Sequence, residues 1–193
     1  ARNKGYIVEI EEEDVTSGIA LPGSWDEYLG LLNKKDRHEL RRKFRRLNSI
    51  GEFALVESRL EDLGDNIEKF IQMMTESRED KRDFMLPERE RFFRSMAFAM
   101  GKEGYLRLMF LELEGEKVAA VVCFDYANTR FLYNSGYRLE YRHYAVGLLL
   151  KALCIKDAIE AGLNYFDFLR GSEPYKYDLG AADSPLYSIL IER

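Results

Sequence analysis

The sequence predicts a mixed α/β protein in which helices cover both faces of a sheet of six or seven strands. Two segments, 105–114 and 117–126, flank Glu114-Gly115-Glu116 and predict a β-hairpin. Residues 130–137, 146–161 and 164–169 then follow as strand, helix and strand. A helical crossover of this length makes the two strands that it joins parallel. The hairpin is therefore expected to lie in the same sheet as a parallel pair.

The first fifty residues predict a short strand followed by two helices. A strand is expected at 6–10, and the acidic residues 11–14 are expected to form a solvated turn. Ser24 is a good N-cap, and Glu27, three residues later, completes a capping box for a short helix. A longer helix at 35–50 places an apolar stripe on one face, made by Leu40, Phe44 and Leu47.

The middle of the chain predicts a strand and two further amphipathic helices. The strand is expected at 52–58, and a helix at 60–79 would bury Ile67, Phe70, Ile71 and Met74. Residues 81–84 are expected to be a charged link, and Pro87 to begin the next helix at a position where proline is permitted. The apolar stripe of that helix consists of Phe92, Phe93, Met96, Ala97 and Met100. The chain is expected to end with a short helix at 172–177 and a strand at 186–192.

The crossover helix has a predicted buried face and a predicted polar face. Val146, Leu149, Leu150, Leu153, Cys154 and Ala158 recur with a helical period, and Lys151, Lys156, Asp157 and Glu160 occupy the opposite side. Gly162 is placed for a left-handed C-cap. Ser135-Gly136 is expected to end the preceding strand.

Composition narrows the class of protein. With 46% hydrophobic and 33% charged residues in 193, the chain can form a packed core with a charged surface. No apolar run approaches the roughly 18–20 residues that span a bilayer, and no signal-peptide core is visible, so a cytoplasmic location is expected. Cys123 and Cys154 are expected to be reduced core residues. Two histidines without paired spacing predict no metal site.

Positive charge is concentrated in one helix. The net charge is −5, yet residues 34–46 contain eight Lys or Arg against Asp36 and Glu39. Two interpretations stay open at this point. The helix is either an ordinary exposed one whose basic side chains lie over the surface, or a docking site for phosphates of a cofactor, a nucleotide-linked substrate or tRNA.

The start of the crossover helix predicts an anion site. Small residues stand where the helix begins, so unpaired backbone N–H groups can point at an anion. This loop resembles the pyrophosphate loop of the GNAT family of acyl-CoA-dependent N-acyltransferases, which reads Arg or Gln, two residues, Gly, one residue, then Gly or Ala. The frame here is Arg142, Ala145 and Gly147, with Ala145 in place of the first glycine. A purely structural turn between strand and helix accommodates the same residues.

Further motifs extend the resemblance from Pro22 to Arg193. The segments are Trp25-Asp26-Glu27-Tyr28, the basic run 34–43, Tyr133-Asn134-Ser135-Gly136-Tyr137, Phe166-Asp167-Phe168-Leu169-Arg170-Gly171 and Tyr175-Lys176. Together they are similar to the BioF2-like (CelD-type) acetyltransferase group, which is related to the Fem aminoacyltransferases. The resemblance implies a GNAT-like, mostly antiparallel sheet with a central splayed parallel pair. It also implies one domain at 22–193 after a lead-in at 1–21, as the C-terminal half of a tandem protein.

The same resemblance implies roles for particular residues. The pantetheine arm of an acyl-CoA co-substrate would enter the gap between the parallel strands, where a backbone N–H near Asn134, Ser135 or Gly136 would bind the thioester carbonyl. The loop residues expected to hold the cofactor are Arg142, His143, Tyr144, Ala145, Val146, Gly147 and Leu148. Asp167 is the first choice of general base, ahead of Asp125 and Glu140, and Tyr175 is the expected acid. Lys176 and Arg170 are expected to bind the substrate.

Three hypotheses of function follow. The first is an acyl-CoA-dependent N-acyltransferase that moves an acyl group, acetyl in the simplest case, to a primary amine of a small molecule or envelope precursor. The second is a Fem-like transferase that uses aminoacyl-tRNA held by Arg41, Arg42 and Arg45. The third is a degenerate GNAT-like half without catalytic activity. A second GNAT-like half or a second copy of the chain is an expected partner.

Overall fold

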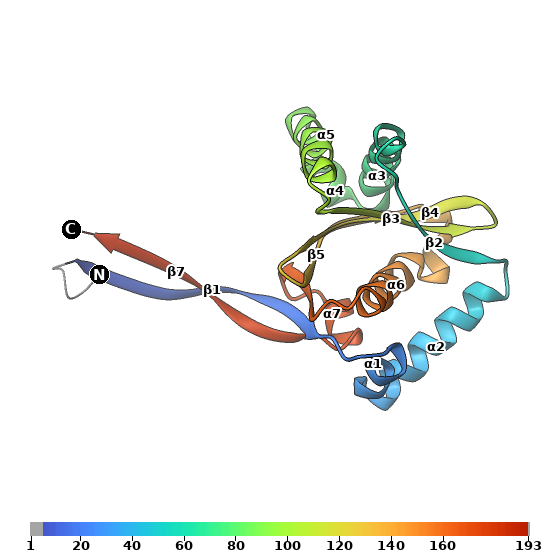
Figure 1. Cartoon of the computed structure of the whole chain (residues 1–193), viewed down its shortest axis with the longest axis horizontal. Helices are drawn as coiled ribbons and strands as arrows, with labels where there is room; N and C mark the ends of the chain where they lie inside the picture. The colour runs from blue at the N-terminus through green and yellow to red at the C-terminus, as the bar shows by residue number, and fades with distance from the viewer. Residues whose placement is uncertain (1–5, 193) are drawn as a thin grey trace.

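The computed structural model describes residues 6–192 and shows a seven-stranded sheet with helices on both faces (Figure 1). The order across the sheet is β2-β3-β4-β5-β6-β1-β7, and all neighbouring pairs are antiparallel except β5 and β6. The strands are β1 (Ile7–Ala20), β2 (Phe53–Glu57), β3 (Leu106–Leu113), β4 (Glu116–Tyr126), β5 (Thr129–Tyr137), β6 (Tyr165–Arg170) and β7 (Ala182–Glu192). The mixed, mostly antiparallel sheet with one central parallel pair is thereby confirmed.

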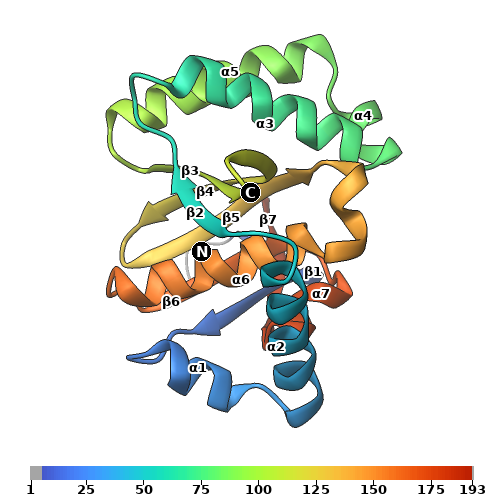
Figure 2. The same ribbon diagram turned by 90° about the vertical axis from the view of Figure 1, so that its right-hand side faces the viewer.

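The helices form two layers. Helices α3, α4 and α5 cover one face of the sheet, and α6 lies on the other face with α1, α2 and α7 (Figures 1 and 2). Their bounds are α1 (Trp25–Leu31), α2 (Lys34–Asn48), α3 (Leu63–Ser77), α4 (Glu79–Phe84), α5 (Pro87–Lys102), α6 (Val146–Glu160) and α7 (Pro174–Asp178), and a 3₁₀ helix, η2, spans Leu139–Tyr144. Each layer has its own buried cluster, one around Phe70 and Phe93 and one around Leu149 and Leu150.

Local signals predicted the hairpin and the helix ends correctly. Glu114 and Gly115 both have a positive φ, 51° and 80°, which is what a two-residue turn between twisted strands requires. The Ser24 side chain caps α1 by accepting a hydrogen bond from the Glu27 amide at 3.2 Å. Gly162 ends α6 with φ of 74°.

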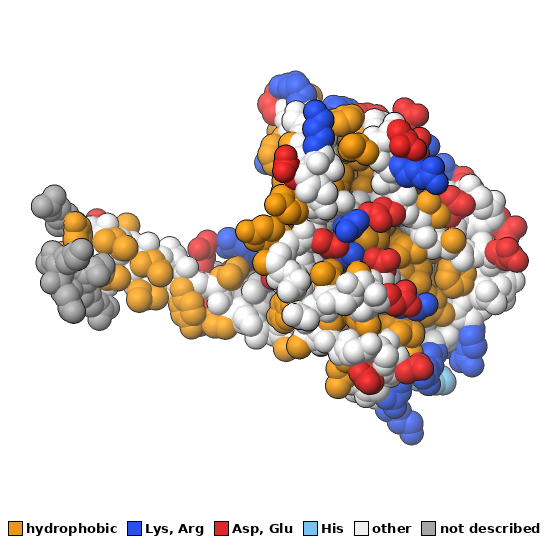
Figure 3. Space-filling model, in the orientation of Figure 1, with side chains coloured by type: hydrophobic (Ala, Val, Ile, Leu, Met, Phe, Trp, Pro, Cys, Tyr) orange, Lys and Arg blue, Asp and Glu red, His pale blue; other side chains and the backbone are white. Residues whose placement is uncertain are grey.

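The acidic turn predicted at residues 11–14 is wrong, because these residues continue β1. Strand β1 pairs with β7 from Ile7↔Glu192 to Gly18↔Ala182, and the two strands project from the body as a ribbon (Figure 1). Apolar side chains line this β1–β7 ribbon (Figure 3), and that of Ile189 is 59% exposed. The acidic run tolerates strand geometry because both faces of the projecting ribbon meet water.

Gly136 is the last residue but one of β5, close to the strand end that the sequence predicted, and α3 packs closely against it. A Cβ at this position would lie 2.5 Å from the Met73 carbonyl carbon and from the Met74 Cα. Only a residue without a side chain allows this approach of a helix backbone to a strand. Gly136 therefore sets the distance between α3 and the centre of the sheet.

Other differences concern charged segments and helix faces. The predicted link at 81–84 is part of α4, and Phe92, predicted to be in the apolar stripe of α5, is 54% exposed. Lys151, predicted on the polar face of α6, is buried. Cys123 and Cys154 lie buried in the core as expected.

A buried arginine ties the crossover to the sheet. Arg130 on β5 is 1% exposed, and its guanidinium donates to Asp125 at 2.7 Å and 2.8 Å, to Asp157 at 2.6 Å, and to the Cys154 carbonyl at 3.1 Å. These bonds satisfy the buried charge. They hold α6 in a fixed position over β4 and β5, and so position the start of α6.

Candidate active site

A gap opens between the two parallel strands. Strands β5 and β6 pair only at Thr129↔Tyr165, Arg130↔Phe166 and Phe131↔Asp167, although both strands continue beyond these residues. Two irregularities accompany the divergence. The register of β5 against β4 shifts around Tyr133, and Leu169 near the end of β6 has a left-handed φ of 60°. The unpaired stretches leave room for a ligand between them.

A cavity of about 530 Å³, here called the gap cavity, occupies this divergence. Its walls come from β5 and β6 and from the α3, α4, α6 and α7 helices. The charged side chains in the lining are Arg78, Asp80, Lys81, Lys151, Arg170 and Glu173. The cavity is thus unusually rich in charge for a space next to the core of the sheet.

A second, smaller hollow of about 200 Å³ lies at the start of α6; we call it the loop hollow. Ala145 takes the left-handed conformation there, with φ 57° and ψ 33°, and leads directly into the helix. Among the described residues, Ala145, Leu148 and Leu149 use their amides in backbone hydrogen bonds, whereas no acceptor is found for Val146 and Gly147. These first amides of a helix attract an anion.

The two hollows are neighbours, because Tyr137, Lys151 and Tyr175 line both of them. We call the two hollows together the passage. It extends from the unpaired amides of α6 to the space between the diverging strands. This geometry suits a long ligand with an anionic end and a reactive end.

The family comparison agrees with this arrangement, because the model for the acetyltransferase (GNAT) domain matches residues 34–177. The chain belongs to the GNAT acetyltransferase family. The matched segment includes both hollows and the strands between them.

Solved structures share the GNAT fold of this chain at low sequence identity. FemX superposes with a TM-score of 0.73 at 13% identity, covering 95% of this chain and 64% of its own. L-PGS from Bacillus licheniformis superposes with a TM-score of 0.63 at 12% identity, and the match covers 100% of this chain and 63% of that protein. A conserved protein from Bacteroides thetaiotaomicron superposes with a TM-score of 0.65 at 10% identity, and the match covers 97% of this chain and 62% of that protein. The chain thus spans less than two thirds of these proteins, and they show the fold alone. No curated protein sequence matches the chain.

The GNAT domain has a buried lysine that sequence reasoning missed. Lys151 on α6 is 8% exposed, and its ammonium donates to the Gly147 carbonyl at 3.1 Å and lies 4.7 Å from the centre of the Tyr175 ring. Burial lowers its pKa to about 8. The spacing of one helical turn from Gly147 is the signal in the sequence that places it beside the loop.

Lys81 is the second lysine that was missed. It reaches from α4 to β5, where its ammonium donates to Asn134 Oδ1 at 3.2 Å and to the Ser135 carbonyl. Burial lowers the pKa of Lys81 to about 8, and the charge of Arg78 adds to this effect. Its segment was predicted to be a link, so nothing in the sequence indicated a site residue here.

The expected cofactor residues divide into those that line the passage and those that do not. Arg142, Ala145, Val146, Gly147 and Leu148 line the loop hollow, and Asn134 and Ser135 line the gap cavity. Gly136, His143 and Tyr144 line neither. The ring centres of His143 and Tyr144 lie 4.0 Å apart, and the Arg46 guanidinium carbon lies 5.3 Å from the centre of the Tyr144 ring.

The backbone amide that best suits a thioester carbonyl belongs to a different residue of β5 from those that the sequence predicted. The Ser135 amide already donates to Asn134 Oδ1 at 2.8 Å. Arg138 donates to Val118 on β4, so the preceding Tyr137 amide points to the opposite side, towards the gap. Among the described residues, the Tyr137 amide has no acceptor and is the better candidate.

Tyr175 lies where the expectation of an acid placed it. It belongs to α7 and lines both hollows, and burial raises the pKa of its hydroxyl. No described residue hydrogen-bonds this hydroxyl, and no buried side-chain atom in the described part of the chain lacks a partner. The hydroxyl therefore opens into the passage.

Three other expected site residues make structural contacts. Asp167 accepts hydrogen bonds from Thr16 Oγ1 at 2.9 Å and from the Leu169 amide at 2.7 Å, and so braces the bend of β6. Lys176 is 1% exposed and donates to the carbonyls of residues 169–171 and to Glu173. Arg170 lines the gap cavity but is paired with Glu13 and Asp14. This geometry does not favour a base at Asp167 or a substrate contact at Lys176.

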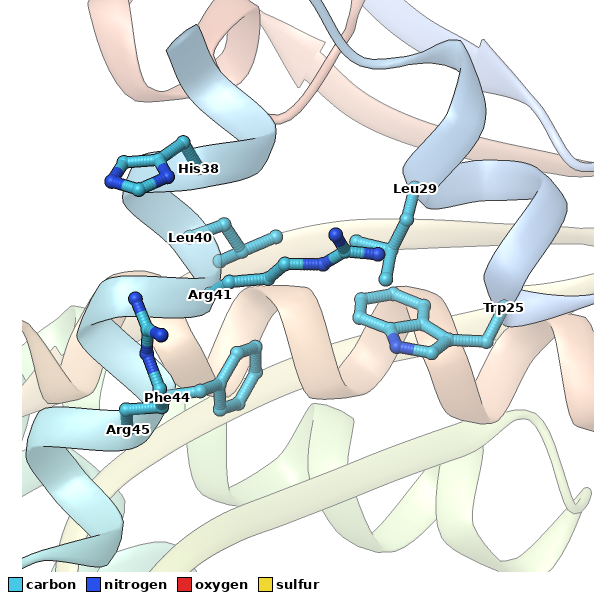
Figure 4. A pocket seen from close by; sticks show the side chains of 7 residues that line it. All are labelled: Trp25, Leu29, His38, Leu40, Arg41, Phe44 and Arg45. Carbon is cyan, nitrogen blue, oxygen red and sulfur yellow. The ribbon is translucent and has the colours of Figure 1, made fainter. Parts of the chain in front are cut away.

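The basic helix α2 borders a different surface groove. Trp25, Leu29, Leu40 and Phe44 form an apolar floor, and His38, Arg41 and Arg45 line the same groove of about 470 Å³ (Figure 4). Arg42 is paired with Glu39 at 2.6 Å, whereas no ion pair is found for Arg41 or Arg45 within residues 6–192. The groove shares no lining residue with the passage, and tRNA binding by these arginines stays a prediction.

Residues 6–192 contain neither a helix suited to span a membrane nor a cluster of metal ligands. No helix in that range is both long and apolar enough to cross a membrane. The same range contains no group of three or more His, Cys, Asp or Glu that could hold a metal ion.

Proposed function

We propose that this GNAT domain transfers an acyl group from acyl-CoA to a primary amine by direct attack of the amine on the thioester. The observation that carries the proposal is the passage itself, which joins unpaired amides at the start of α6 to the gap between β5 and β6. An acyl-CoA has the matching chemistry, because a diphosphate stands at one end of its pantetheine arm and a thioester at the other.

Each end of the passage has residues that fit the co-substrate. The amides of Val146 and Gly147, with Arg142 beside them, would hold the pyrophosphate. Ala145 adopts the conformation that glycine favours in this position of the family frame, so its methyl group does not prevent the turn. The apolar middle of the arm would lie along Tyr137 and Tyr175.

The reaction needs few groups from the protein. The Tyr137 amide would donate to the thioester oxygen and stabilise the oxyanion that forms as the amine nitrogen bonds to the carbonyl carbon. When the C–S bond breaks, Tyr175 would donate its proton to the leaving thiolate. The attacking amine loses one proton as it becomes an amide, and that proton replaces the one that Tyr175 gave up. Alignment of the two substrates supplies much of the acceleration.

Calorimetry with acetyl-CoA tests the proposal. We expect binding in the micromolar range for the wild type and at least a tenfold loss for Gly147→Asp, because a carboxylate would then stand at the pyrophosphate site. Gly64→Asp is the matched control, since Gly64 is also the second residue of a fifteen-residue helix, and a Cβ there would meet only the Phe98 ring at 3.9 Å. A Cβ at Gly147 would lie 3.1 Å from the Tyr137 ring, which can rotate away. An acid in the first turn is compatible with either helix. Equal binding by both variants, or none by the wild type, would rule the proposal out.

A Fem-like reaction with aminoacyl-tRNA is the second candidate. The observation in its favour is a pair of arginines on the basic helix α2, Arg41 and Arg45, for which the described part of the chain, residues 6–192, supplies no ion-pair partner. Reversal of charge at both positions should abolish tRNA binding and leave acetyl-CoA binding intact. A domain that binds neither ligand would support the third hypothesis, a non-catalytic half.

A further inference from the structure

The charges in the gap cavity do not balance within the protein. Two of the six charged side chains in its lining pair with each other, Arg78 with Asp80 at 2.8 Å. Arg170 is neutralised by β1 residues outside the cavity, and Glu173 is neutralised by the buried Lys176 at 2.9 Å. Within residues 6–192 this leaves Lys81 and Lys151 without a carboxylate within 4 Å.

Neither lysine is satisfied by its present contacts. An ammonium has three N–H donors; Lys81 uses two of them on Asn134 and Ser135, and Lys151 uses one on Gly147. Lys151 is buried and Lys81 is half-buried, and a charge that is withheld from water without a counter-ion is costly. The proximity of the two lysines adds to the cost, because the charge of Lys81 is one cause of the lowered pKa of Lys151.

The proposed reaction leaves the charge of Lys81 unused. The diphosphate of acyl-CoA belongs at the loop hollow, which Lys151 lines but Lys81 does not, and the pantetheine arm and an acetyl group carry no charge. Because Lys81 lines the gap cavity and not the loop hollow, the negative group that balances its charge belongs to the other substrate.

We infer that the amine acceptor of this domain carries an acidic group, a carboxylate or a phosphate, that binds between Lys81 and Lys151. The description of this ligand as an amine acceptor rests on the proposed function, whereas the anion site itself rests only on the two lysines. Their remaining N–H groups would donate to the oxygens of the acid. The acid would thus anchor the acceptor beside the gap while its amine faces the thioester.

Thermal unfolding with inorganic phosphate as the probe tests the anion site. The protein is first saturated with CoA, so that the loop hollow is filled, and phosphate is compared with chloride at equal ionic strength. We expect phosphate to raise the Tm of the wild type by about 2–4 °C. The increase should disappear in Lys81→Met and Lys151→Met and remain in Lys156→Met, which changes an exposed lysine of α6.

The outcome separates this inference from the proposed function. If CoA binds but phosphate stabilises the Lys81→Met variant as much as the wild type, the anion site is wrong and the transferase proposal stands. If CoA does not bind, the transferase proposal fails. The anion site is then judged by whether phosphate stabilisation depends on Lys81, because that side chain does not reach the start of α6.

Matched acceptors then distinguish the two kinds of acid. With acetyl-CoA as donor, β-alanine is compared with its amide, and phosphoethanolamine with ethanolamine. The acidic member of one pair should have at least a tenfold higher kcat/KM, and Lys81→Met should remove the preference. Turnover of the neutral members at equal rates would overturn the inference.

Discussion

Replacing Lys151 by methionine should make the protein more stable. A lysine pKa lowered from 10.5 to about 8 corresponds to about 3 kcal/mol by which the buried charge disfavours the folded state at pH 7. Methionine has a similar length and carries no charge. It forfeits the hydrogen bond to Gly147 and the contact with the Tyr175 ring, which together offset about 1–2 kcal/mol. We expect a net increase of about 1–2 kcal/mol in the free energy of unfolding at pH 7.

The increase should depend on pH in a defined direction. Between about pH 8 and 10.5, folded wild-type protein has released the Lys151 proton while the unfolded chain still holds it. Wild-type stability therefore rises with pH through this window relative to Lys151→Met, and the advantage of the variant shrinks. Urea unfolding followed by circular dichroism at pH 7 and pH 9.5 measures both values.

The matched control is Lys156→Met on the same helix. Lys156 is 42% exposed and lies 3.6 Å from Glu160, so its loss should change stability by less than about 0.5 kcal/mol at either pH. A Lys151→Met protein that is less stable than the wild type at pH 7, or whose advantage is the same at pH 9.5, would show that Lys151 is not held as an unpaired buried cation.

Three further predictions concern the frame and the chemistry. Gly136→Ala should destabilise the protein by about 2–3 kcal/mol because its Cβ would meet the α3 backbone, whereas Gly30→Ala, with open space around it, should stabilise by up to about 1 kcal/mol; urea titration compares the two. Arg130→Met should cost about 2–4 kcal/mol by removing the buried cation that joins Asp125 to Asp157, and Arg130→Lys should recover part of the loss in the same titration. Tyr175→Phe should lower kcat about 10²-fold with little change in KM in a steady-state thiol-release assay, and an unchanged kcat would exclude it as the acid.

The central part of the fold was predictable because its signals are local. The hairpin turn at Glu114-Gly115 and the period of α6 each lie within a short window of sequence. The full length of β1 was not predictable, since residues 11–14 become a strand only through pairing with β7 near the other end of the chain. The close packing of Gly136 against α3 was not predictable, because the α3 backbone that it meets, at Met73 and Met74, is far away in sequence.

The loop at the start of α6 could be found from the sequence, whereas the charged side chains of the gap cavity could not. The small residues after Arg142, which predict an anion site, line the loop hollow. Lys81 and Lys151 were missed because a lysine in a helix is ordinarily solvated. The spacing of Lys151 from Gly147 was the one signal in the sequence, and Lys81 had none. Asp167 was ranked first as the base because its strand borders the gap. A side chain on such a strand can equally face the neighbouring strand, and that of Asp167 faces Thr16 on β1.

The position of β1 has a consequence for how the polypeptide acquires its shape during synthesis. Strand β1 lies between β6 and β7, two strands that follow it in sequence after every other strand of the sheet. It has no hydrogen-bonding neighbour in the sheet until β6 has been made, and such long-range pairing is slow. Nascent chains that still lack β7 should consequently leave one edge of β1 open to strand exchange with other chains, a hazard that holdase chaperones relieve.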